Sequence, residues 1–295
     1  MKKLVIYTVL VGDYDEIRDP LVINDRFDYI LFTDKLSPAQ YNIWQKVEIP
    51  ITGINNMLRS RYVKCHPTKV LGDYEASLYI DANIQIATPN VYERFFELLE
   101  NGTEWAGIKH PDQGCVYEEI CAIVDLKWVH DYDVVNWYGK MKKDGFPEGW
   151  GLYENSIIFR RHSPKIEAIG DLWWNTLMAG CKRDQFSLMY VLWKYQPSMS
   201  LFLPEGDCPR LLNSKDFVYY EHNPHKRILH QGILERLRRS SLRVSSSDLR
   251  AGYHDLFNRL SKCRNPKSRL FAWEMGAIIK YGYKVVANAI SSRKK

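Results

Sequence analysis

Short apolar runs that end in polar residues recur along the chain and alternate with segments of helical periodicity. The first run, residues 4–11, is continuous and rich in β-branched side chains, as expected for a strand buried on both faces of a sheet. Further strands are predicted at residues 28–34, 43–49, 76–80, 105–109 and 217–220. Strands that alternate with helices indicate a doubly wound, mostly parallel α/β sheet, and such sheets bind ligands at the carboxyl ends of their strands.

Four helices are predicted between these strands. Residues 55–66 have helical spacing and stop before Pro67, which disfavours helix in the residue ahead of it. Thr88-Pro89 and Ser163-Pro164 each read as an N-cap followed by Pro at the first helical position, with the helices ending near Gly102 and Gly180. The fourth predicted helix covers residues 183–194.

The most polar motifs of this region follow predicted strands. They are Gly12–Asp15, Asp34 and Asp81-Ala82-Asn83. Because alternate residues at a strand end point the same way, Asp81 and Asn83 could bind one hard divalent cation, Mn²⁺ or Mg²⁺. The competing interpretation of the tripeptide is an Asx turn after a strand.

Further candidate residues come from helices and loops. Asp184 and Gln185 open a helix, where a carboxylate either caps the first turn or acts on a substrate as a general base or charge stabiliser. Glu154 follows a loop rich in glycine and aromatic residues, which suits either a sugar-binding loop or a plain turn. His222 ends the last strand and could be a metal ligand, although a lone histidine is more often structural.

Basic residues gather on the first predicted helix. Arg59, Arg61 and Lys64 share it, and the last two are three residues apart and therefore lie on one face. They could bind a diphosphate, although a solvated basic face is the commoner explanation.

The cysteine pattern indicates a reducing compartment, and the N-terminus is better explained as a strand than as a signal peptide. The six cysteines form no C-x-x-C pair and no zinc-type cluster with histidine. Residues 1–3 and the apolar run after them could begin a signal peptide, but an acidic loop follows at once, so a buried strand is the better interpretation. No run reaches the roughly 20 apolar residues of a membrane span. We expect a cytoplasmic protein.

Phosphate-loop, dinucleotide-binding, zinc-protease and nucleophile-elbow motifs do not occur.

Several short motifs occur in a fixed order over residues 4–230. They are Tyr7-Thr8, Gly12–Asp15, Phe32-Thr33-Asp34, residues 59–64, Tyr79–Asn83, Lys109-His110-Pro111, Tyr117-Glu118-Glu119, Asn155 and Lys182–Gln185. In this order they resemble a family of GT-A-type glycosyltransferases formerly catalogued as a domain of unknown function, with bacterial polysaccharide members and plant cell-wall and mucilage members.

The resemblance implies a GT-A-like, Rossmann-like fold over residues 1–232 and a nucleotide-sugar donor. Residues Thr8, Gly12 and Tyr14 would cradle the donor, with Asp34 and Arg61 near its nucleoside and diphosphate. Asp81-Ala82-Asn83 stands where such enzymes have the metal-binding D-x-D, with Asn in place of the second Asp, and His222 would be a further metal ligand. Asp184-Gln185 resembles a pair placed beside the reacting sugar carbon.

The remaining residues, 233–295, form a basic C-terminal helical extension. They hold 15 Lys and Arg against 4 Asp and Glu, whereas residues 1–232 hold 26 against 31. Apolar residues from Leu270 to Ile290 are flanked by Lys and Arg, which is typical of a helix lying on an anionic membrane surface. Packing of this tail on the catalytic body, or on a second subunit in a homodimer, is the alternative.

The expected function is transfer of a hexose-type sugar from a nucleotide-sugar, a UDP-sugar by preference, to a glycan or lipid-linked acceptor in bacterial surface polysaccharide or lipopolysaccharide synthesis. The enzyme would be cytoplasmic, or peripheral on the inner face of the cytoplasmic membrane. A sugar nucleotidyltransferase, a degenerate sugar-binding homologue and a non-catalytic protein that binds nucleic acid through its tail are the alternatives. The acidic body and the absence of a nucleic-acid-binding signature argue against the last of these, so no nucleic-acid partner is expected.

Overall fold

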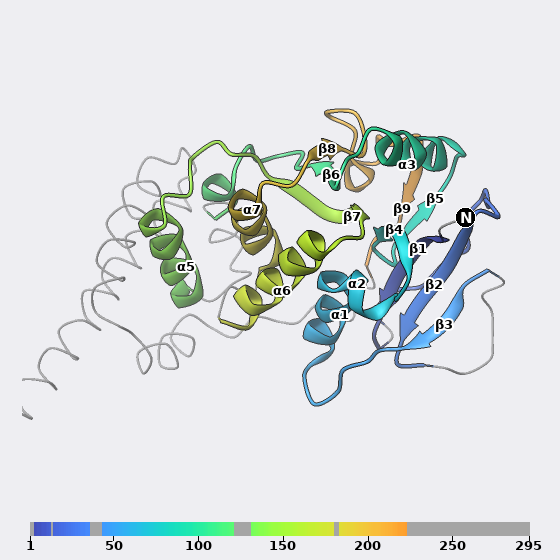
Figure 1. Ribbon diagram of the computed structural model, residues 1–295, viewed down its shortest axis with the longest axis horizontal. Coiled ribbons are helices and arrows are strands. Elements are labelled where there is room, and N and C mark those ends of the chain that lie inside the picture. Colours follow the sequence, from blue (N-terminus) through green and yellow to red (C-terminus); the bar gives the residue numbers. More distant parts are fainter. Residues whose placement is uncertain (1–2, 13, 36–42, 121–130, 180–182, 223–295) are drawn as a thin grey trace, which may run out of the picture. The chain divides into compact units, whose positions relative to one another are not determined.

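The computed structural model describes residues 3–12, 14–35, 43–120, 131–179 and 183–222 (Figure 1). The chain divides into two compact units. The first comprises residues 1–114, 150–179 and 184–228, and the second residues 115–149, 180–183 and 229–295. The predicted boundary between residues 232 and 233 and the whole basic tail lie outside the described residues.

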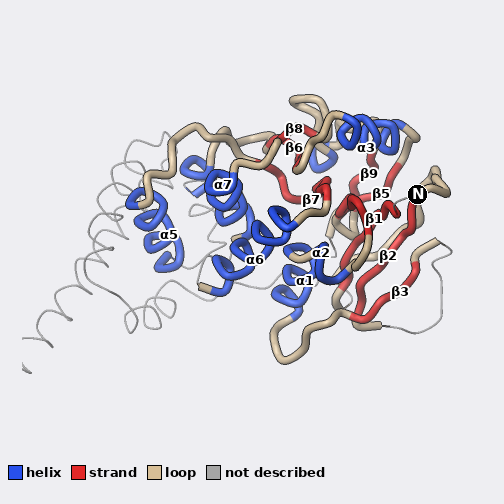
Figure 2. The backbone as a smooth tube through the Cα atoms, viewed as in Figure 1, coloured by secondary structure: helices blue, strands red, loops and turns tan. Residues whose placement is uncertain are grey.

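The first unit is built on a seven-stranded sheet in the order β3-β2-β1-β4-β7-β6-β8 (Figure 2). The strands are β1 (Lys3–Leu10), β2 (Phe27–Thr33), β3 (Gln45–Glu48), β4 (Tyr74–Ile80), β6 (Trp105–Lys109), β7 (Tyr153–Arg161) and β8 (Met199–Leu201). Neighbouring strands are parallel except that β7 runs antiparallel to both β4 and β6. The predicted doubly wound, mostly parallel α/β sheet is therefore confirmed, with one reversed strand that the sequence pattern does not indicate.

A second, two-stranded sheet joins β5 (Ile84–Ile86) to β9 (Phe217–Tyr219) in antiparallel fashion. The strand predicted at residues 217–220 is thus present, but it pairs outside the main sheet. Its partner β5 follows directly on the Asp81-Ala82-Asn83 turn and is too short to stand out by periodicity.

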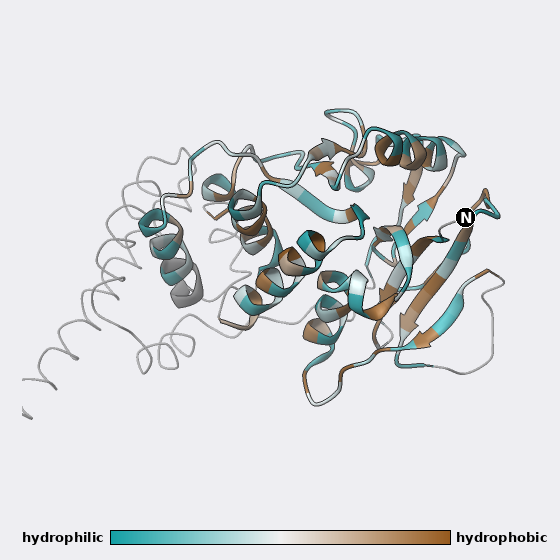
Figure 3. Cartoon of the chain, viewed as in Figure 1, coloured by the Kyte–Doolittle hydropathy of each residue, from teal (hydrophilic) through white to brown (hydrophobic). Residues whose placement is uncertain are grey.

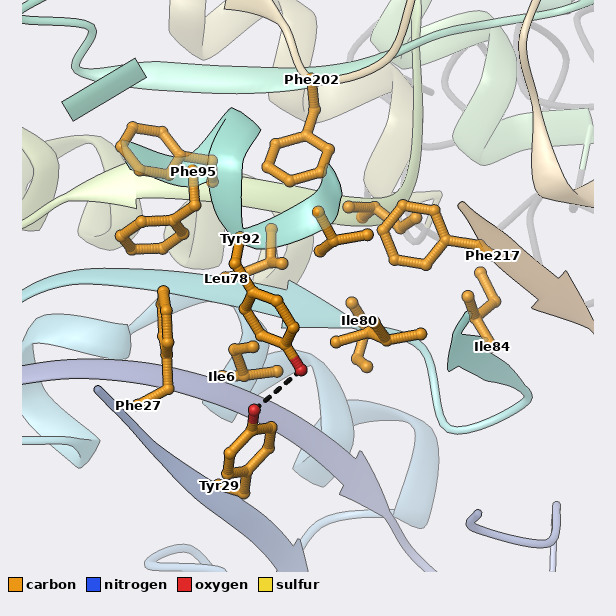
Figure 4. Packing of buried hydrophobic residues seen from close by; sticks show 14 of the residues in the cluster. Ile6, Phe27, Tyr29, Leu78, Ile80, Ile84, Tyr92, Phe95, Phe202 and Phe217 are labelled. Carbon is orange, nitrogen blue, oxygen red and sulfur yellow. Dashed lines mark hydrogen bonds between the residues drawn. The ribbon is translucent and has the colours of Figure 1, made fainter. Parts of the chain in front are cut away.

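One face of the main sheet packs against α3 (Asn90–Glu100). Even-numbered residues of β1 face this core, and in Figure 3 β1 and β2 are largely hydrophobic along their length. Phe95 and Tyr92 of α3 lie over Leu78 and Phe27 in Figure 4, where the hydroxyls of Tyr92 and Tyr29 are joined by a 2.8 Å hydrogen bond. This face is the main hydrophobic core of the unit.

The predicted cap of α3 is wrong. Pro89 takes the N-cap position and makes no side-chain cap hydrogen bond. The Thr88 hydroxyl donates instead to the carboxylate of Asp216, a partner 128 residues away that local sequence cannot reveal.

The opposite face carries α1 (Asn56–Cys65), α2 (Pro67–Val70), α6 (Pro164–Met178) and α7 (Asp184–Tyr195). Asn55 caps α1 and Ser163 caps α6, each accepting a backbone N–H three residues on. Helices α1 and α6 meet at Gly170, where an added Cβ would lie 2.3 Å from the Cys65 carbonyl oxygen. The contact requires glycine, and it fixes the last turn of α1 against α6.

The second unit contains α5 (Asp131–Lys143), which the sequence analysis does not predict. The hydroxyl of Tyr117 donates to the carbonyl of Phe146 at 2.8 Å, and its ring meets that of Tyr138 at 5.2 Å between centroids. Across the described ranges of the chain, no helix has the length and hydropathy needed to cross a membrane.

Candidate active site at the carboxyl edge of the sheet

A hydrogen bond joins the loop after β1 to the Asp34 carboxylate, which follows β2. The backbone N–H of Gly12 donates to both carboxylate oxygens of Asp34, at 2.9 and 3.1 Å. Gly12 has a φ of +64°, and a Cβ there would lie 3.3 Å from the side-chain amide of Asn56 at the start of α1. Glycine therefore allows the loop to pass close to the N-terminus of α1.

Arg59 connects this pair to the helix. Its guanidinium lies 3.7 Å from the carboxylate of Asp34, and its Nε donates to the carbonyl of Ile51 at 3.1 Å. Thus the predicted donor-site residues Gly12, Asp34 and Arg59 lie together at the ends of β1 and β2.

One turn further along α1, two cations meet two carboxylates from other elements. Arg61 Nη2 lies 3.2 Å from Asp184 Oδ1. Lys64 Nζ lies 3.4 Å from Asp81 Oδ1 and 3.6 Å from Asp184 Oδ2. We call Arg61, Lys64, Asp81 and Asp184 the Lys64 cluster. It brings together residues predicted separately as diphosphate-binding, metal-binding and catalytic.

Arg61, Lys64 and Asp184 are largely shielded from solvent, whereas the side chain of Asp81 is 33% exposed. The side chain of Lys64 is 8% exposed and that of Asp184 12% exposed. A buried charge is tolerated when it is paired, and removing one partner of such a pair costs about 3–5 kcal/mol. Burial alone would lower the pKa of Arg61, but the neighbouring Asp184 carboxylate outweighs it, and the net pKa is raised. Arg61 therefore stays charged beside Asp184.

Tyr79, which the sequence indicates only as part of the motif Tyr79–Asn83, orients Asp81. Its hydroxyl donates to Asp81 Oδ1 at 2.6 Å. Burial, followed by the Asp81 charge, raises the pKa of Tyr79 well above its ordinary value, so the phenol remains a donor at neutral pH. The Asp81 backbone N–H donates to the Ser156 carbonyl at 2.8 Å, which ties the end of β4 to β7.

Asp184 is the first residue of α7, at the start of the predicted helix, and its backbone carbonyl accepts two hydrogen bonds. The indole N–H of the buried Trp173 donates to the Asp184 carbonyl at 3.2 Å, and the Ser187 hydroxyl donates to the same oxygen at 3.2 Å. These contacts fix the turn that presents the Asp184 carboxylate to α1.

Several buried polar atoms without a protein partner occur on the strands and helices that carry these residues. Within the described ranges, no hydrogen bond is made by the Thr8 hydroxyl, the Gln185 side-chain carbonyl, the Arg61 Nε or either end of the Asn155 amide. Thr8 precedes the end of β1, Gln185 follows Asp184, and Asn155 precedes Ser156. An unsatisfied buried polar group costs about 1–3 kcal/mol, so each of these atoms lowers the stability of the folded chain.

The predicted metal ligands have other contacts. The Asn83 side-chain N–H donates to the Tyr220 carbonyl at 2.7 Å. His222 Nδ1 lies 2.9 Å from Asp15 Oδ1, and its ring is 5.2 Å from that of Tyr14. Over the described part of the chain, no three His, Cys, Asp or Glu side chains are placed to hold a metal ion. Because the Lys64 ammonium lies 3.4 Å from Asp81 Oδ1, these residues are not arranged for a divalent cation, and the metal stays a prediction.

Glu154 lies in a second polar cluster, with His110 and Arg210. Glu154 Oε2 is 3.4 Å from Arg210 Nε and 3.7 Å from His110 Nε2. His110 Nδ1 accepts the backbone N–H groups of Asp112 and Gln113 at 3.3 and 3.1 Å, which places the ring proton of a neutral imidazole on Nε2, toward Glu154. His110 belongs to a motif noted in the sequence, whereas no local signal indicates Arg210.

Comparison with known proteins is consistent with this geometry. The family model described as TOD1/MUCI70, glycosyltransferase-like domain, matches residues 1–210. This range holds every strand of the main sheet and the whole Lys64 cluster. No curated protein gives a significant match.

Proposed function

Because the chain belongs to the TOD1/MUCI70 glycosyltransferase-like domain family, we propose that it transfers a sugar from a nucleotide-sugar to a hydroxyl of an acceptor. The observation that carries the proposal is the Lys64 cluster. Two cations and two carboxylates from three elements converge at the carboxyl edge of a mostly parallel sheet, where α/β proteins bind ligands.

The donor would bind along the ends of β1 and β2. Tyr14 is 43% exposed, and its ring, which lies 5.2 Å from that of His222, would stack on a nucleobase. Asp34 would accept hydrogen bonds from the nucleoside. Arg59, Arg61 and Lys64 would bind the diphosphate, since guanidinium and ammonium groups form strong charge-assisted hydrogen bonds with phosphate.

The chemical step needs a group that stabilises the sugar carbon and a group that accepts a proton. The Asp184 carboxylate faces two cations, Arg61 and Lys64. We propose that Asp184 stabilises the positive charge that develops at the anomeric carbon. Gln185 would form a hydrogen bond with the sugar. Glu154 faces one cation and a neutral imidazole, and we assign it as the base that takes the acceptor hydroxyl proton.

The finer identity of the reaction rests on the sequence. We propose a UDP-hexose donor, a glycan or lipid-linked acceptor, and a role in bacterial surface polysaccharide or lipopolysaccharide synthesis. The basic tail would bring the enzyme to the inner face of the cytoplasmic membrane or join two copies. These assignments follow from the resemblance and from the charge of residues 233–295.

The primary test is nucleotide binding by calorimetry with the full chain. UDP is expected to bind, and GDP and CMP serve as comparison nucleotides. Failure of all three to bind would remove the transferase proposal. Release of pyrophosphate from UTP and a sugar 1-phosphate would indicate the nucleotidyltransferase instead.

Asp184→Asn tests the chemical role. Hydrolysis of a panel of UDP-sugars is expected to fall about 10²- to 10³-fold in kcat, the range found when one electrostatic stabiliser of a transition state is lost. UDP affinity should not fall, because the neutral amide leaves Arg61 and Lys64 free for phosphate. Asp171→Asn, an exposed carboxylate on α6, is the control. Unchanged hydrolysis by Asp184→Asn would contradict the assignment.

A further inference from the structure

Lys64 is the one described side chain whose charge is shared between the end of β4 and the start of α7. Its ammonium lies within 3.6 Å of a carboxylate oxygen from each element. Asp81 is also the residue that stands at the first position of the expected metal-binding motif. A positive charge therefore already lies where a cation bound by Asp81 would lie.

The position of Lys64 is fixed by buried groups. Its backbone carbonyl accepts a hydrogen bond from Arg160 Nη1 at 2.5 Å, and Arg160 is 0% exposed. Its ammonium lies 4.7 Å from the ring centre of Tyr79, whose hydroxyl holds the same Asp81 oxygen. The ammonium is thus held by the sheet on one side and by two carboxylates on the other, before any ligand arrives.

The predicted metal site and Lys64 exclude each other. A divalent cation on Asp81 would be repelled by an ammonium that lies 3.4 Å from an oxygen of the same carboxylate. An ammonium has three N–H donors. Two can point to Asp81 and Asp184, and the third remains for a phosphate oxygen.

We propose that the Lys64 ammonium takes the place of a divalent cation, so that the nucleoside diphosphate is bound and released without metal. The inference rests on the proposed function. When the bond between the anomeric carbon and the diphosphate breaks, its electron pair passes to the phosphate oxygen, where Lys64 and Arg61 stabilise it. The acceptor oxygen bonds to the anomeric carbon, and its proton passes to Glu154.

The experiment compares UDP binding by calorimetry in EDTA and in manganese, with the full chain. The wild type is expected to bind UDP with the same Kd in both buffers, within about twofold. Lys64→Met should weaken binding in EDTA by about 10- to 100-fold, the loss of one charge-assisted hydrogen bond. Lys64→Arg keeps the charge and should recover part of the affinity. Lys69→Met, an exposed lysine paired with Asp171 on the same side of the sheet, should bind as the wild type does.

Two results would overturn the proposal. One is wild-type binding that needs manganese, and the other is Lys64→Met binding UDP in EDTA as tightly as the wild type. If no nucleotide binds in either buffer, the proposed function fails together with this inference. That outcome can be told apart from the two results above, because in each of them the wild type still binds UDP.

Manganese binding in the absence of nucleotide gives an independent readout. Electron paramagnetic resonance of free Mn²⁺ should show the same weak binding to the wild type and to Asp81→Asn. Tight binding that Asp81→Asn abolishes would restore the metal site and contradict the role of Lys64, while leaving the transferase proposal intact. Thermal unfolding of each variant shows whether it is folded under the conditions of the titration.

Discussion

The two faces of the main sheet are buried to a similar degree and differ in chemistry. On the α3 side, Phe95, Leu78 and their neighbours form a cluster of hydrophobic side chains (Figure 4). On the side of α1, α6 and α7, the buried residues include Arg160, Ser77 and Lys64. Apolar burial is non-directional, whereas buried polar groups require partners at defined positions. The first face supplies stability, and the second determines where the site residues lie.

The largest expected effect is on the apolar face. Phe95→Ala removes a fully buried ring that packs edge-on against Phe27 and Phe159, at 4.9 Å between centroids in each case. It should lower the free energy of unfolding by about 3–5 kcal/mol, measured by urea denaturation. UDP affinity of the folded variant should be unchanged. A loss of UDP affinity in a folded Phe95→Ala protein would show that the two faces are not separable in this way.

The next effect is a pH dependence that belongs to the polar face. Burial, and then the charge of Arg160, lower the pKa of His162 from 6.5 to about 4. The unfolded chain therefore binds a proton between pH 6.5 and 4 while the folded protein does not, and stability is lost as the pH falls through this window. The loss should approach about 3 kcal/mol at 1.4 kcal/mol per pH unit.

Urea denaturation between pH 7 and 4 measures this effect. His162→Gln keeps a polar side chain near the Ser77 hydroxyl, which lies 2.9 Å from His162 Nε2, and should flatten the profile. Other groups titrate in the same range in both proteins, so the difference between the two profiles is the informative quantity. Identical profiles would assign the acid sensitivity to other groups.

Arg160→Met should have the smallest effect on stability of the three changes, together with a measurable loss of UDP affinity. Arg160→Met removes a buried guanidinium whose partners are the Lys64 carbonyl and the Tyr7 hydroxyl. Loss of these hydrogen bonds should cost about 1–3 kcal/mol of unfolding free energy. Because Arg160 holds the backbone of Lys64, UDP affinity should also fall, by about tenfold, whereas Phe95→Ala leaves it unchanged. If Arg160→Met loses stability and keeps full UDP affinity, Arg160 has a structural role alone.

The two faces also differ in how far sequence reasoning reaches them. The apolar runs predict the strands well because burial on both faces leaves a continuous hydrophobic signal, as in β1. The polar tips of β1, β2 and β4 were correctly predicted to gather at one edge. The three-residue spacing of Arg61 and Lys64 was correctly taken to put both on one face, since both contact Asp184.

Other features depend on partners far apart in the sequence. Arg160 stands in an apolar strand where its role depends on Tyr7 and the Lys64 carbonyl, and Thr88 bonds Asp216 rather than its own helix. The reversal of β7 has no local signature, because a strand's direction is set by which neighbours it pairs with. His222 was predicted as a metal ligand from its place after a strand, and its contact with Asp15 comes from the loop after β1.

The reversed strand has a consequence for how such a protein can diversify. Lys109 at the end of β6 pairs with Tyr153 at the start of β7, and the His110 N–H donates to the Leu152 carbonyl at 2.9 Å. The sheet thus closes the base of the segment between residues 110 and 152. Lengthening such a closed segment costs little, since loop-closure free energy rises only by about 0.6 kcal/mol per doubling of length. The stretch between β6 and β7 can therefore change in length while the sheet and the Lys64 cluster stay as they are.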